Sequence, residues 1–434
     1  MVGESIKLPC GQLIKNRFCK SAMTERIAGQ DNFVNKRHLN LYDFWSKSGA
    51  GILLTGNVQI DRMHMEGPSN VCIEKSTYKE QLKKLKQWAE ISESHGSKLW
   101  MQLSHAGRQT PGEMNAATLA PSSVPLDIKA PGRKFGAPVA MTEEQIIDVI
   151  NRFIFAATVA QDSGFSGIQI HSAHGYLMSE FLSPDVNKRT DAWGGVIKNR
   201  SRALVEIIRG CRKRLGTDFP ISVKINSSDF QKGGFSAEDS IEVAKILSSE
   251  KIDLLEISGG TYEHVSFLDA GEDLGINSKP KELRRESTIA REAYFLEYAK
   301  DIREVMNIPL MVTGGFRTKK AMNSALKEGF CEVIGVARPL CSHPYCVQDL
   351  LDGQIEKLPS YEERLRLGNG WLSPNSPFNL VRAANFLSSQ YWFYTQIKKM
   401  ADGKLPDLNF GPLAALLSEY KIDYRGYRDF KKAI

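Results

Sequence analysis

Three residues with acid–base or hydrogen-bonding side chains follow one short apolar run of the sequence. The run GIQI begins at Gly167, and His171, His174 and Tyr176 come directly after it. A short apolar run behind glycines predicts a buried strand, and α/β proteins place their chemistry at the carboxyl ends of such strands. Either histidine alone could be a structural residue whose ring is satisfied by the backbone. The three together at one strand end favour a site that donates hydrogen bonds and protons.

A lysine and a glutamine interrupt two other predicted strands. Lys224 lies in ISVKIN, and Gln102 lies in WMQLS. An ammonium group among apolar neighbours is costly to bury unless it meets a negative partner, and a buried amide needs hydrogen bonds. The alternative for Lys224 is a place at the rim of the sheet. If it is buried, we expect Lys224 to face an anionic group.

Glycines mark the ends of the last two predicted strands. Gly314 and Gly315 follow MVT, and Ala337 and Arg338 follow VIGV. Glycines let backbone N–H groups approach a phosphate, and an arginine adds a bidentate partner. A single glycine pair is usually only a turn, but the loops after strands seven and eight are the common phosphate sites of barrels. The two strand ends together predict a phosphate site. A Rossmann domain is not expected, because no G-x-G-x-x-G follows the first strand.

Apolar strand-like runs alternate with helical periodicity through most of the chain. Thr142 with Gln145, Thr77 with Glu80, and Ser236 are expected to cap helices. Continuous apolar strands separated by helices predict a closed (β/α)8 TIM barrel over residues 1–355, preceded by a β-hairpin at 5–16. The predicted strands are Arg17–Met23, Gly51–Asn57, Lys98–Leu103, Gly167–His171, Ile221–Asn226, Asp253–Ser258, Leu310–Gly314 and Glu332–Ala337.

The alternation stops near residue 355, and residues 356–434 are predicted to form a C-terminal helical extension. Helices are expected at 376–402 and 411–420. The aromatic run 391–394 is expected to pack either in the core or at the interface of a homodimer, with an active-site lid as the alternative. Two long connections, 104–141 and 259–289, are predicted to be irregular loops on the catalytic face.

Composition narrows the functional class. The chain has 434 residues, 42% hydrophobic and 25% charged, which describes an ordinary soluble globular protein. The net charge of +7 is modest and its basic residues are scattered, so no nucleic-acid partner is expected. The sequence shows no signal peptide and no run long enough to span a membrane. The 7 cysteines include no C-x-x-C pair, which predicts free thiols, no metal and a cytoplasmic location.

With these residues assembled, the chain resembles the Old Yellow Enzyme family, the FMN-dependent ene-reductases of the NADH:flavin oxidoreductase/NADH oxidase group. The resemblance covers roughly residues 4–350 and implies a (β/α)8 barrel with one FMN over its carboxyl face. NAD(P)H would be the electron donor, and the partner would be a small-molecule substrate with an activated C=C bond. The motifs that carry it are KNRFCKSAMTE, MQLSHAGRQ, IQIHSAHGYLMSEFLSPDVNKRTDAWGG, SVKIN, ISGGTYE, VTGGF and IGVARPL.

The resemblance also implies roles for individual residues. His171 and His174 would hydrogen-bond the carbonyl oxygen of the substrate, and Tyr176 would donate the proton. Thr24 would tune the flavin, and Lys224 would stand beside its N1/C2 carbonyl region. The residues that would contact FMN are Ser21, Ala22, Met23 and Thr24 at the ring, Gly56, Gln102 and Lys224 at its polar edge, and Gly314, Gly315, Ala337 and Arg338 at the phosphate.

The chain departs from the family pattern at two positions, and the lysine at one of them points to one branch. Many members have arginine in place of Lys224 and alanine in place of Gly56, and lysine is more like the NADH oxidase and dienoyl-CoA reductase branch. That branch often continues into a cysteine-rich iron–sulfur loop and a second nucleotide-binding domain. Here the region reads RLRLGNGWLSPN, without cysteine, so neither a cluster nor FAD is expected. His264 is an alternative participant in proton transfer, as in dienoyl reductases.

Other functions remain open at this stage. The same site could serve a diaphorase or oxidase that passes electrons to quinones or oxygen. A flavin-free barrel lyase or isomerase acting on a phosphorylated substrate belongs to another class, and a non-catalytic binding scaffold to a third. A yellow preparation that releases FMN on denaturation would exclude the last two.

Overall fold

Eight parallel strands close into a barrel in the computed structural model, which describes residues 1–126, 134–259 and 296–433. The barrel closes because β4 pairs with both β3 and β6, and β3 pairs with β13. All the predicted strands are present, and the barrel prediction is confirmed. They are β3 (Phe18–Lys20), β4 (Ile52–Leu54), β6 (Lys98–Ser104), β9 (Gly167–Ser172), β10 (Ile221–Asn226), β11 (Leu254–Ser258), β12 (Leu310–Thr313) and β13 (Val333–Val336).

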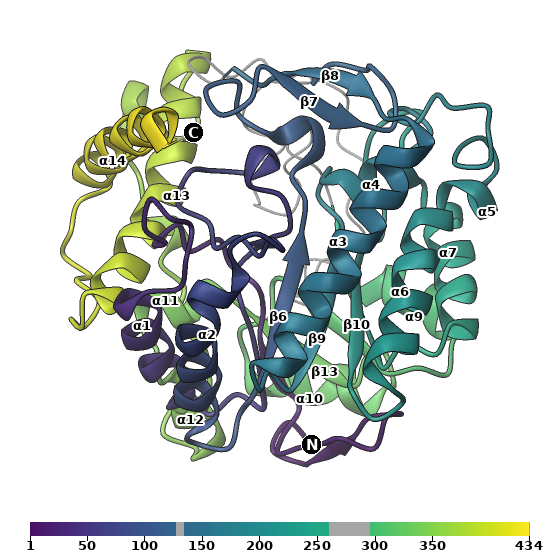
Figure 1. Ribbon diagram of the computed structural model, residues 1–434. Coiled ribbons are helices and arrows are strands. Elements are labelled where there is room, and N and C mark those ends of the chain that lie inside the picture. The colour runs from purple at the N-terminus through teal and green to yellow at the C-terminus, as the bar shows by residue number, and fades with distance from the viewer. Residues whose placement is uncertain (127–133, 260–295, 434) are drawn as a thin grey trace.

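Helices follow the strands and cover the barrel (Figure 1). The capping boxes predicted at Thr142 and Ser236 are confirmed by reciprocal bonds with Gln145 and Asp239. The one predicted at Thr77 is wrong: its ψ of -12° departs from the extended N-cap conformation, and its side chain makes no capping bond. The helices are α1 (Lys36–Ser46), α2 (Tyr78–Glu93), α3 (Glu143–Asp162), α6 (Arg202–Leu215), α7 (Ala237–Ser249), α9 (Leu296–Arg303), α10 (Lys319–Lys327) and α12 (Cys346–Leu351).

Smaller elements lie at the two ends of the barrel. The predicted hairpin is formed by β1 (Ile6–Lys7) and β2 (Leu13–Ile14), which pair antiparallel below the strands (Figure 1). The connection 104–141 is more regular than predicted, because two of its segments pair as parallel strands over the opposite end. The remaining elements within the barrel residues are β5 (Val58–Gln59), η1 (Arg62–His64), η2 (Gly107–Gln109), β7 (Ala117–Ala120), β8 (Ala137–Ala140), α4 (Leu177–Leu182), α5 (Ile197–Arg200) and α11 (Pro339–Ser342).

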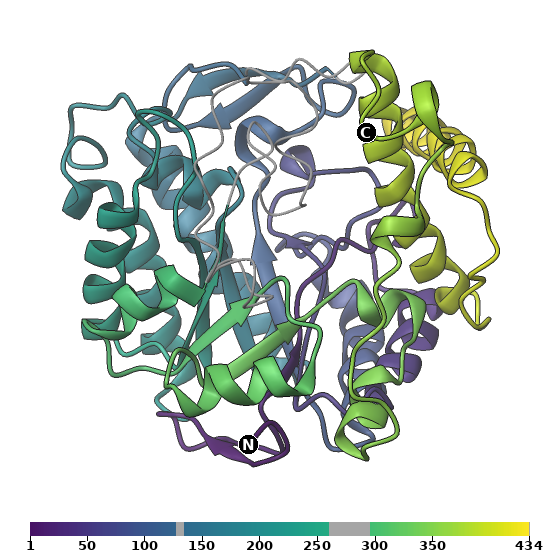
Figure 2. The same cartoon turned by 180° about the vertical axis from the view of Figure 1, so that it is seen from behind.

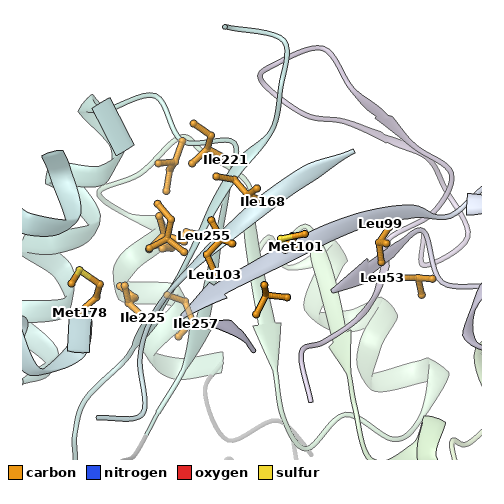
Figure 3. Close-up of a cluster of buried hydrophobic side chains, with 14 of the residues drawn as sticks. Leu53, Leu99, Met101, Leu103, Ile168, Met178, Ile221, Ile225, Leu255 and Ile257 are labelled. Atoms are coloured by element: carbon orange, nitrogen blue, oxygen red, sulfur yellow. The ribbon is translucent and has the colours of Figure 1, made fainter. Parts of the chain in front are cut away.

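The largest apolar core lies between the strands and the helices. Alternate residues of each strand point outward into it, as Leu99, Met101 and Leu103 do along β6 (Figure 3). Ile225 and Ile257 occupy the equivalent positions on β10 and β11. Each fully buried aliphatic side chain of this kind contributes about 1.5–3 kcal/mol, so this layer is the main source of the barrel's stability.

The side chains inside the barrel change from apolar at its amino end to polar nearer its carboxyl end. At the amino end, Trp100, Leu254 and Met311 form a second apolar cluster with Ile14 from the N-terminal hairpin. Two residues further along the same strands, the inward side chains become Gln102, Glu256 and Thr313. The polar residues therefore lie nearer the carboxyl end, above an apolar plug.

Two long helices, α13 (Asn379–Ala401) and α14 (Pro412–Ala433), follow the barrel and lie along one side of it (Figure 2). The first matches the prediction; the second runs well beyond residue 420. Asn40 in α1 donates a hydrogen bond of 2.9 Å to the Ala401 carbonyl, and Arg26 forms an ion pair with Asp423 of α14. Trp392 is 1% exposed. None of the described helices has the length and apolarity that a membrane crossing requires.

Candidate active site

The carboxyl end of β9 brings His171, His174 and Tyr176 into contact. The ring centroid of His171 lies 5.3 Å from that of His174 and 4.8 Å from that of Tyr176, both in edge-to-face geometry. His174 adopts a φ of 61°, which turns the chain sharply before Tyr176 caps α4. The sequence cluster is therefore a cluster in space.

Hydrogen bonds fix the orientation of both imidazoles. The Ala173 N–H donates to Nδ1 of His171 at 3.2 Å, which leaves the ring proton on Nε2. Nε2 of His174 lies 2.9 Å from the Ser258 hydroxyl at the end of β11. Burial, followed by the nearby charge of Lys224, lowers the pKa of both rings well below 6.5. Both histidines are neutral at pH 7, and each carries one N–H donor.

Lys224 meets the negative partner that its buried position requires. Its Nζ lies 3.1 Å from Oε1 of Glu256, on the adjacent strand β11 and in register with it. Glu256 is fully buried and also accepts hydrogen bonds from Gln169 at 2.8 Å and Thr313 at 2.8 Å. His171 is the register partner of Lys224 on the other side. The lysine is thus an interior residue of the barrel, directly beside the histidine cluster, and not a rim residue.

The same polar layer extends around the barrel. Gln102 donates to Gln169 at 2.7 Å, which satisfies the buried amide noted in the sequence. The Ser21 hydroxyl lies 2.8 Å from that of Thr313. Five strands therefore contribute to one hydrogen-bonded layer.

The segment after β3 is held against the end of β4. The Gly56 N–H donates to Oε1 of Glu25 at 3.0 Å, and a Cβ at Gly56 would lie 2.6 Å from the Met23 carbonyl. This close approach explains glycine at position 56. Met23 also lies against Cys341, with 3.4 Å between the sulfur atoms, while Ala22 packs against the interior apolar cluster.

Glu66 joins two of the predicted site residues. Its Oε1 accepts a hydrogen bond from the Thr24 hydroxyl at 2.7 Å, and its Oε2 accepts one from the Tyr176 hydroxyl. Glu66 lies in the connection between β5 and α2, and the residue is 8% exposed. A buried acid therefore stands directly behind the expected proton donor.

A second buried carboxylate, that of Asp61, lies in the same connection and faces two histidines. Oδ2 of Asp61 accepts the Nδ1–H of His64 at 2.9 Å, and Nε2 of His105 lies 3.8 Å away. Burial works to raise the pKa of Asp61, but the interactions with His105 and His64 outweigh it and hold that pKa well below its ordinary value. Their ligand atoms lie within 4.8 Å of one another, as a metal site would require.

The hydrogen bonds of the two rings indicate which nitrogen of each carries the proton. The Gly107 N–H donates to Nδ1 of His105 at 3.1 Å, so the ring proton is on Nε2 and faces Asp61. The Asn115 amide lies 3.3 Å from Nε2 of His64, which leaves the proton on Nδ1. In these tautomers each ring turns an N–H toward Asp61, but only His64 is within hydrogen-bond distance, and Nε2 of His105 makes no hydrogen bond within the described residues.

The predicted phosphate end lies at β12 and β13. Gly314 and Gly315 adopt φ values of 122° and 78°, which only glycine reaches without strain. Nε of Arg338 lies 3.1 Å from Oε1 of Glu362, which also pairs with Arg317 at 2.7 Å. Burial works to raise the pKa of Glu362, but Arg338 and Arg317 lower it on balance. A carboxylate from beyond the barrel therefore orients Arg338.

Sequence reasoning missed the acidic partners at this face. Glu256 interrupts an apolar strand just as Lys224 does, so the same signal could have found it. Glu66 and Glu362 lie in irregular segments, where no periodicity marks a buried position. His264 and most of the motif ISGGTYE lie outside the described residues.

Solved structures share this fold. The old yellow enzyme homologue from Zymomonas mobilis is 22% identical, with a TM-score of 0.68 over 83% of this chain and 95% of that one. A 2-naphthoyl-CoA reductase complex is 24% identical, with a TM-score of 0.70, over 82% of this chain and 53% of the other.

Curated relatives and a family model agree on the family. The NADH-dependent flavin oxidoreductase iccE of Talaromyces variabilis is 34% identical over 79% of this chain and 84% of its own length. The NADH oxidase of Thermoanaerobacter brockii is 31% identical over 80% of this chain, which spans 50% of that relative. The model of the NADH:flavin oxidoreductase / NADH oxidase family matches residues 5–356. The chain belongs to this family and is an NAD(P)H-dependent flavin oxidoreductase with FMN as its cofactor.

Proposed function

We propose that this enzyme reduces activated C=C bonds, as in α,β-unsaturated carbonyl compounds, with Tyr176 as the proton donor. The observation that carries the proposal is the contact of His171, His174 and Tyr176 at the end of β9, beside the Lys224–Glu256 pair. Bound FMN supplies the hydride in such a reaction. The protein's own groups bind the carbonyl oxygen and deliver the proton.

The donor set at the carboxyl face suits FMN. Lys224 offers a cation inside the barrel, where the reduced ring carries negative charge, and the polar layer around it offers neutral partners. Gly314, Gly315 and Arg338 offer backbone N–H groups and a guanidinium for a phosphate. We therefore assign the ring end to β3, β6 and β10, and the phosphate end to β12 and β13.

The two neutral imidazoles suit a carbonyl oxygen that gains negative charge. A pair of fixed N–H donors stabilises a developing enolate as an oxyanion hole does, and removing one such donor costs roughly 10²–10³-fold in turnover. Because both rings are held by backbone and serine contacts, little reorganisation is needed when the charge appears. Their neutrality prevents them from acting as strong acids, so the proton must come from another group.

Tyr176 is that group in the proposal. Its ring lies against His171, two positions along the chain from His174, and its side chain is 3% exposed. A phenol remains protonated at neutral pH and can protonate the α-carbon as the hydride reaches the β-carbon.

The deciding experiment separates the two half-reactions of Tyr176→Phe by anaerobic stopped-flow. General acid catalysis contributes roughly 10²–10⁴-fold, so alkene reduction by the reduced enzyme should slow by that factor. Reduction of the flavin by NAD(P)H should keep its wild-type rate, because it requires no proton from Tyr176. Tyr78→Phe is the matched control, since Tyr78 packs against Phe155 on the outer helices.

Two outcomes would contradict the proposal. Equal slowing of both half-reactions would make Tyr176 a residue that positions the flavin. Failure of the wild-type enzyme to reduce any member of an enone panel, with rapid turnover of quinones or oxygen, would favour the second candidate, a diaphorase or oxidase. The relative named NADH oxidase is the observation behind that candidate.

A further inference from the structure

Glu66 is the one carboxylate within the described residues that shares a hydrogen bond with Tyr176. Three side chains donate to it: Tyr176 to Oε2, and Thr24 at 2.7 Å and Asn70 at 3.0 Å to Oε1. The three partners lie on three different segments of the chain, and Glu66, which accepts from all of them, is 8% exposed.

The segment that carries Glu66 is tied down on both sides. Asn70 also donates to the Asn57 carbonyl at 3.3 Å, and Asn32 donates to the carbonyls of Pro68 at 2.8 Å and Asn70 at 3.0 Å. On the other side, the Ala106 N–H donates to the His64 carbonyl at 2.9 Å, and the Leu177 N–H donates to the His105 carbonyl at 3.1 Å. Glu66 is therefore held in place relative to α4 rather than carried on a loose loop.

This arrangement creates a problem for Tyr176 as a proton donor. Its O–H is donated to the Glu66 carboxylate. If the phenol turned and gave up its proton, a phenolate would stand beside a buried carboxylate, and two negative charges in contact repel strongly at low dielectric. A protonated Glu66 removes both obstacles, because its own O–H can then donate to the phenolic oxygen.

We propose that Glu66 acts through Tyr176 as a positioning residue that stores the proton and passes it on during alkene reduction. This inference rests on the proposed function. The enolate electron pair forms the new C–H bond with the phenolic proton, and the phenolic O–H bond breaks. The phenolic oxygen takes the proton of the Glu66 carboxylic acid, so tyrosine ends neutral. The product state is a carboxylate that accepts hydrogen bonds from Thr24, Asn70 and Tyr176, and it takes up one proton from bulk solvent before the next turnover, which is the proton that the overall reduction consumes.

Other titratable groups surround the pair and must be separated from it. Arg26 follows β3 and lies near Gly67, the neighbour of Glu66: a Cβ at Gly67 would be 3.3 Å from its Nε. The other groups are Asp423 of α14, which pairs with Arg26, Asp61 just before η1, His64 at the end of η1, and His171 of β9. None of them changes in Glu66→Gln, so a difference between the two pH profiles reports Glu66.

The test is Glu66→Gln, which keeps the size of the side chain and removes its exchangeable acid. We expect alkene reduction by the reduced enzyme to slow by about 10–100-fold, a part of the roughly 10²–10⁴-fold contribution of a general acid. The pH profile of this half-reaction should also differ between the wild type and the variant. Glu74→Gln is the matched control, since Glu74 lies on the same connection and binds the Arg62 N–H.

Two further measurements keep the inference falsifiable. In mixtures of H2O and D2O, the wild-type alkene half-reaction should depend on two transferring protons, and Glu66→Gln on one. In the Tyr176→Phe background, adding Glu66→Gln should have no further effect, because Glu66 acts through the phenol. If Glu66→Gln loses its FMN, the wild-type isotope dependence alone decides, and a one-proton dependence overturns the inference.

Failure of this inference is distinguishable from failure of the proposed function. If Tyr176→Phe slows alkene reduction selectively while Glu66→Gln leaves its rate and pH profile unchanged, Glu66 only fixes the tyrosine side chain and the inference is wrong. If the wild-type enzyme reduces no alkene, the proposed function itself is wrong.

Discussion

Two lysines are buried in the strands of this barrel, and they lead to opposite conclusions. Lys20 of β3 points outward: its Nζ lies 4.1 Å from the Trp45 ring and donates to the Leu54 carbonyl at 2.6 Å. Lys224 of β10 points inward, 3.1 Å from Glu256. Each has a buried glutamate nearby, since Glu25 lies 4.0 Å from Lys20. A buried lysine–glutamate pair therefore does not by itself mark a site.

The two pairs differ in the residues that surround them. The outer pair is enclosed by Trp45 and by Tyr42, whose hydroxyl donates to Glu25 at 2.5 Å. It fastens the segment after β3 to the ends of β3 and β4. The inner pair lies in the polar layer and is in register with His171. We infer that Lys20 serves stability and that Lys224 serves the flavin.

The largest expected effect is on stability, in Lys20→Met. Removing one member of a buried ion pair leaves the other charge unpaired and typically costs 3–5 kcal/mol, so we expect the free energy of unfolding to fall by about that amount. Denaturant unfolding of the apoprotein measures it. Adding Glu25→Gln should restore part of the loss, because the stranded carboxylate is then gone. A single variant as stable as wild type would show that the outer pair is dispensable.

The second expected effect concerns the flavin midpoint potential. Lys224→Met should lower it and Glu256→Gln should raise it, because the reduced ring carries more negative charge than the oxidised ring. A charge interaction of about 1–4 kcal/mol corresponds to roughly 20–90 mV for a two-electron couple. Lys20→Met, as the control, should leave the potential unchanged in a redox titration. If Lys224→Met and Lys20→Met shifted the midpoint potential equally, the assignment of different roles to the two pairs would be wrong.

The smallest effect is a pH dependence of stability. Burial, partly opposed by Glu25, lowers the pKa of Lys20 from 10.5 to about 8. Between those values the unfolded chain holds a proton that the folded chain has released, so the contribution of Lys20 to the free energy of unfolding rises with pH. The stability difference between wild type and Lys20→Met should therefore widen between about pH 8 and pH 10.5. A constant difference across that range would place the pKa of Lys20 at its ordinary value.

The barrel could be predicted because its signals are local. Each strand is a short apolar run, and the boxes at Thr142 and Ser236 lie within a few residues of the helices they start. The signal at Thr77 failed because residue types do not fix the backbone angles that capping needs. Helix α14 was predicted too short, since its later turns alternate charged and aromatic residues and show no clear apolar face.

The sequence predicted site residues only where they lie within a predicted strand or directly follow its end. His171 and Tyr176 were found together because one strand end carries both. Their partners come from elsewhere in the chain: Glu66 is 110 residues from Tyr176 and 42 from Thr24. No periodicity links such residues, so only the folded chain could reveal the acid behind the tyrosine. The cofactor contacts inferred by resemblance remain predictions for the variants described above.

The ion pair between Arg26 and Asp423 joins residues 397 positions apart. Close by, Phe430 of α14 packs against Met65, the neighbour of Glu66, and against Cys72 and Met114. The ribosome therefore synthesises the eight strands long before it synthesises α14, the helix that packs beside Glu66. Because domains begin to fold from the N-terminal side during synthesis, the nascent barrel should form first, with its Glu66 segment still uncovered. On this view the Glu66 side of the candidate site becomes complete only once α14 has been made and has packed against it.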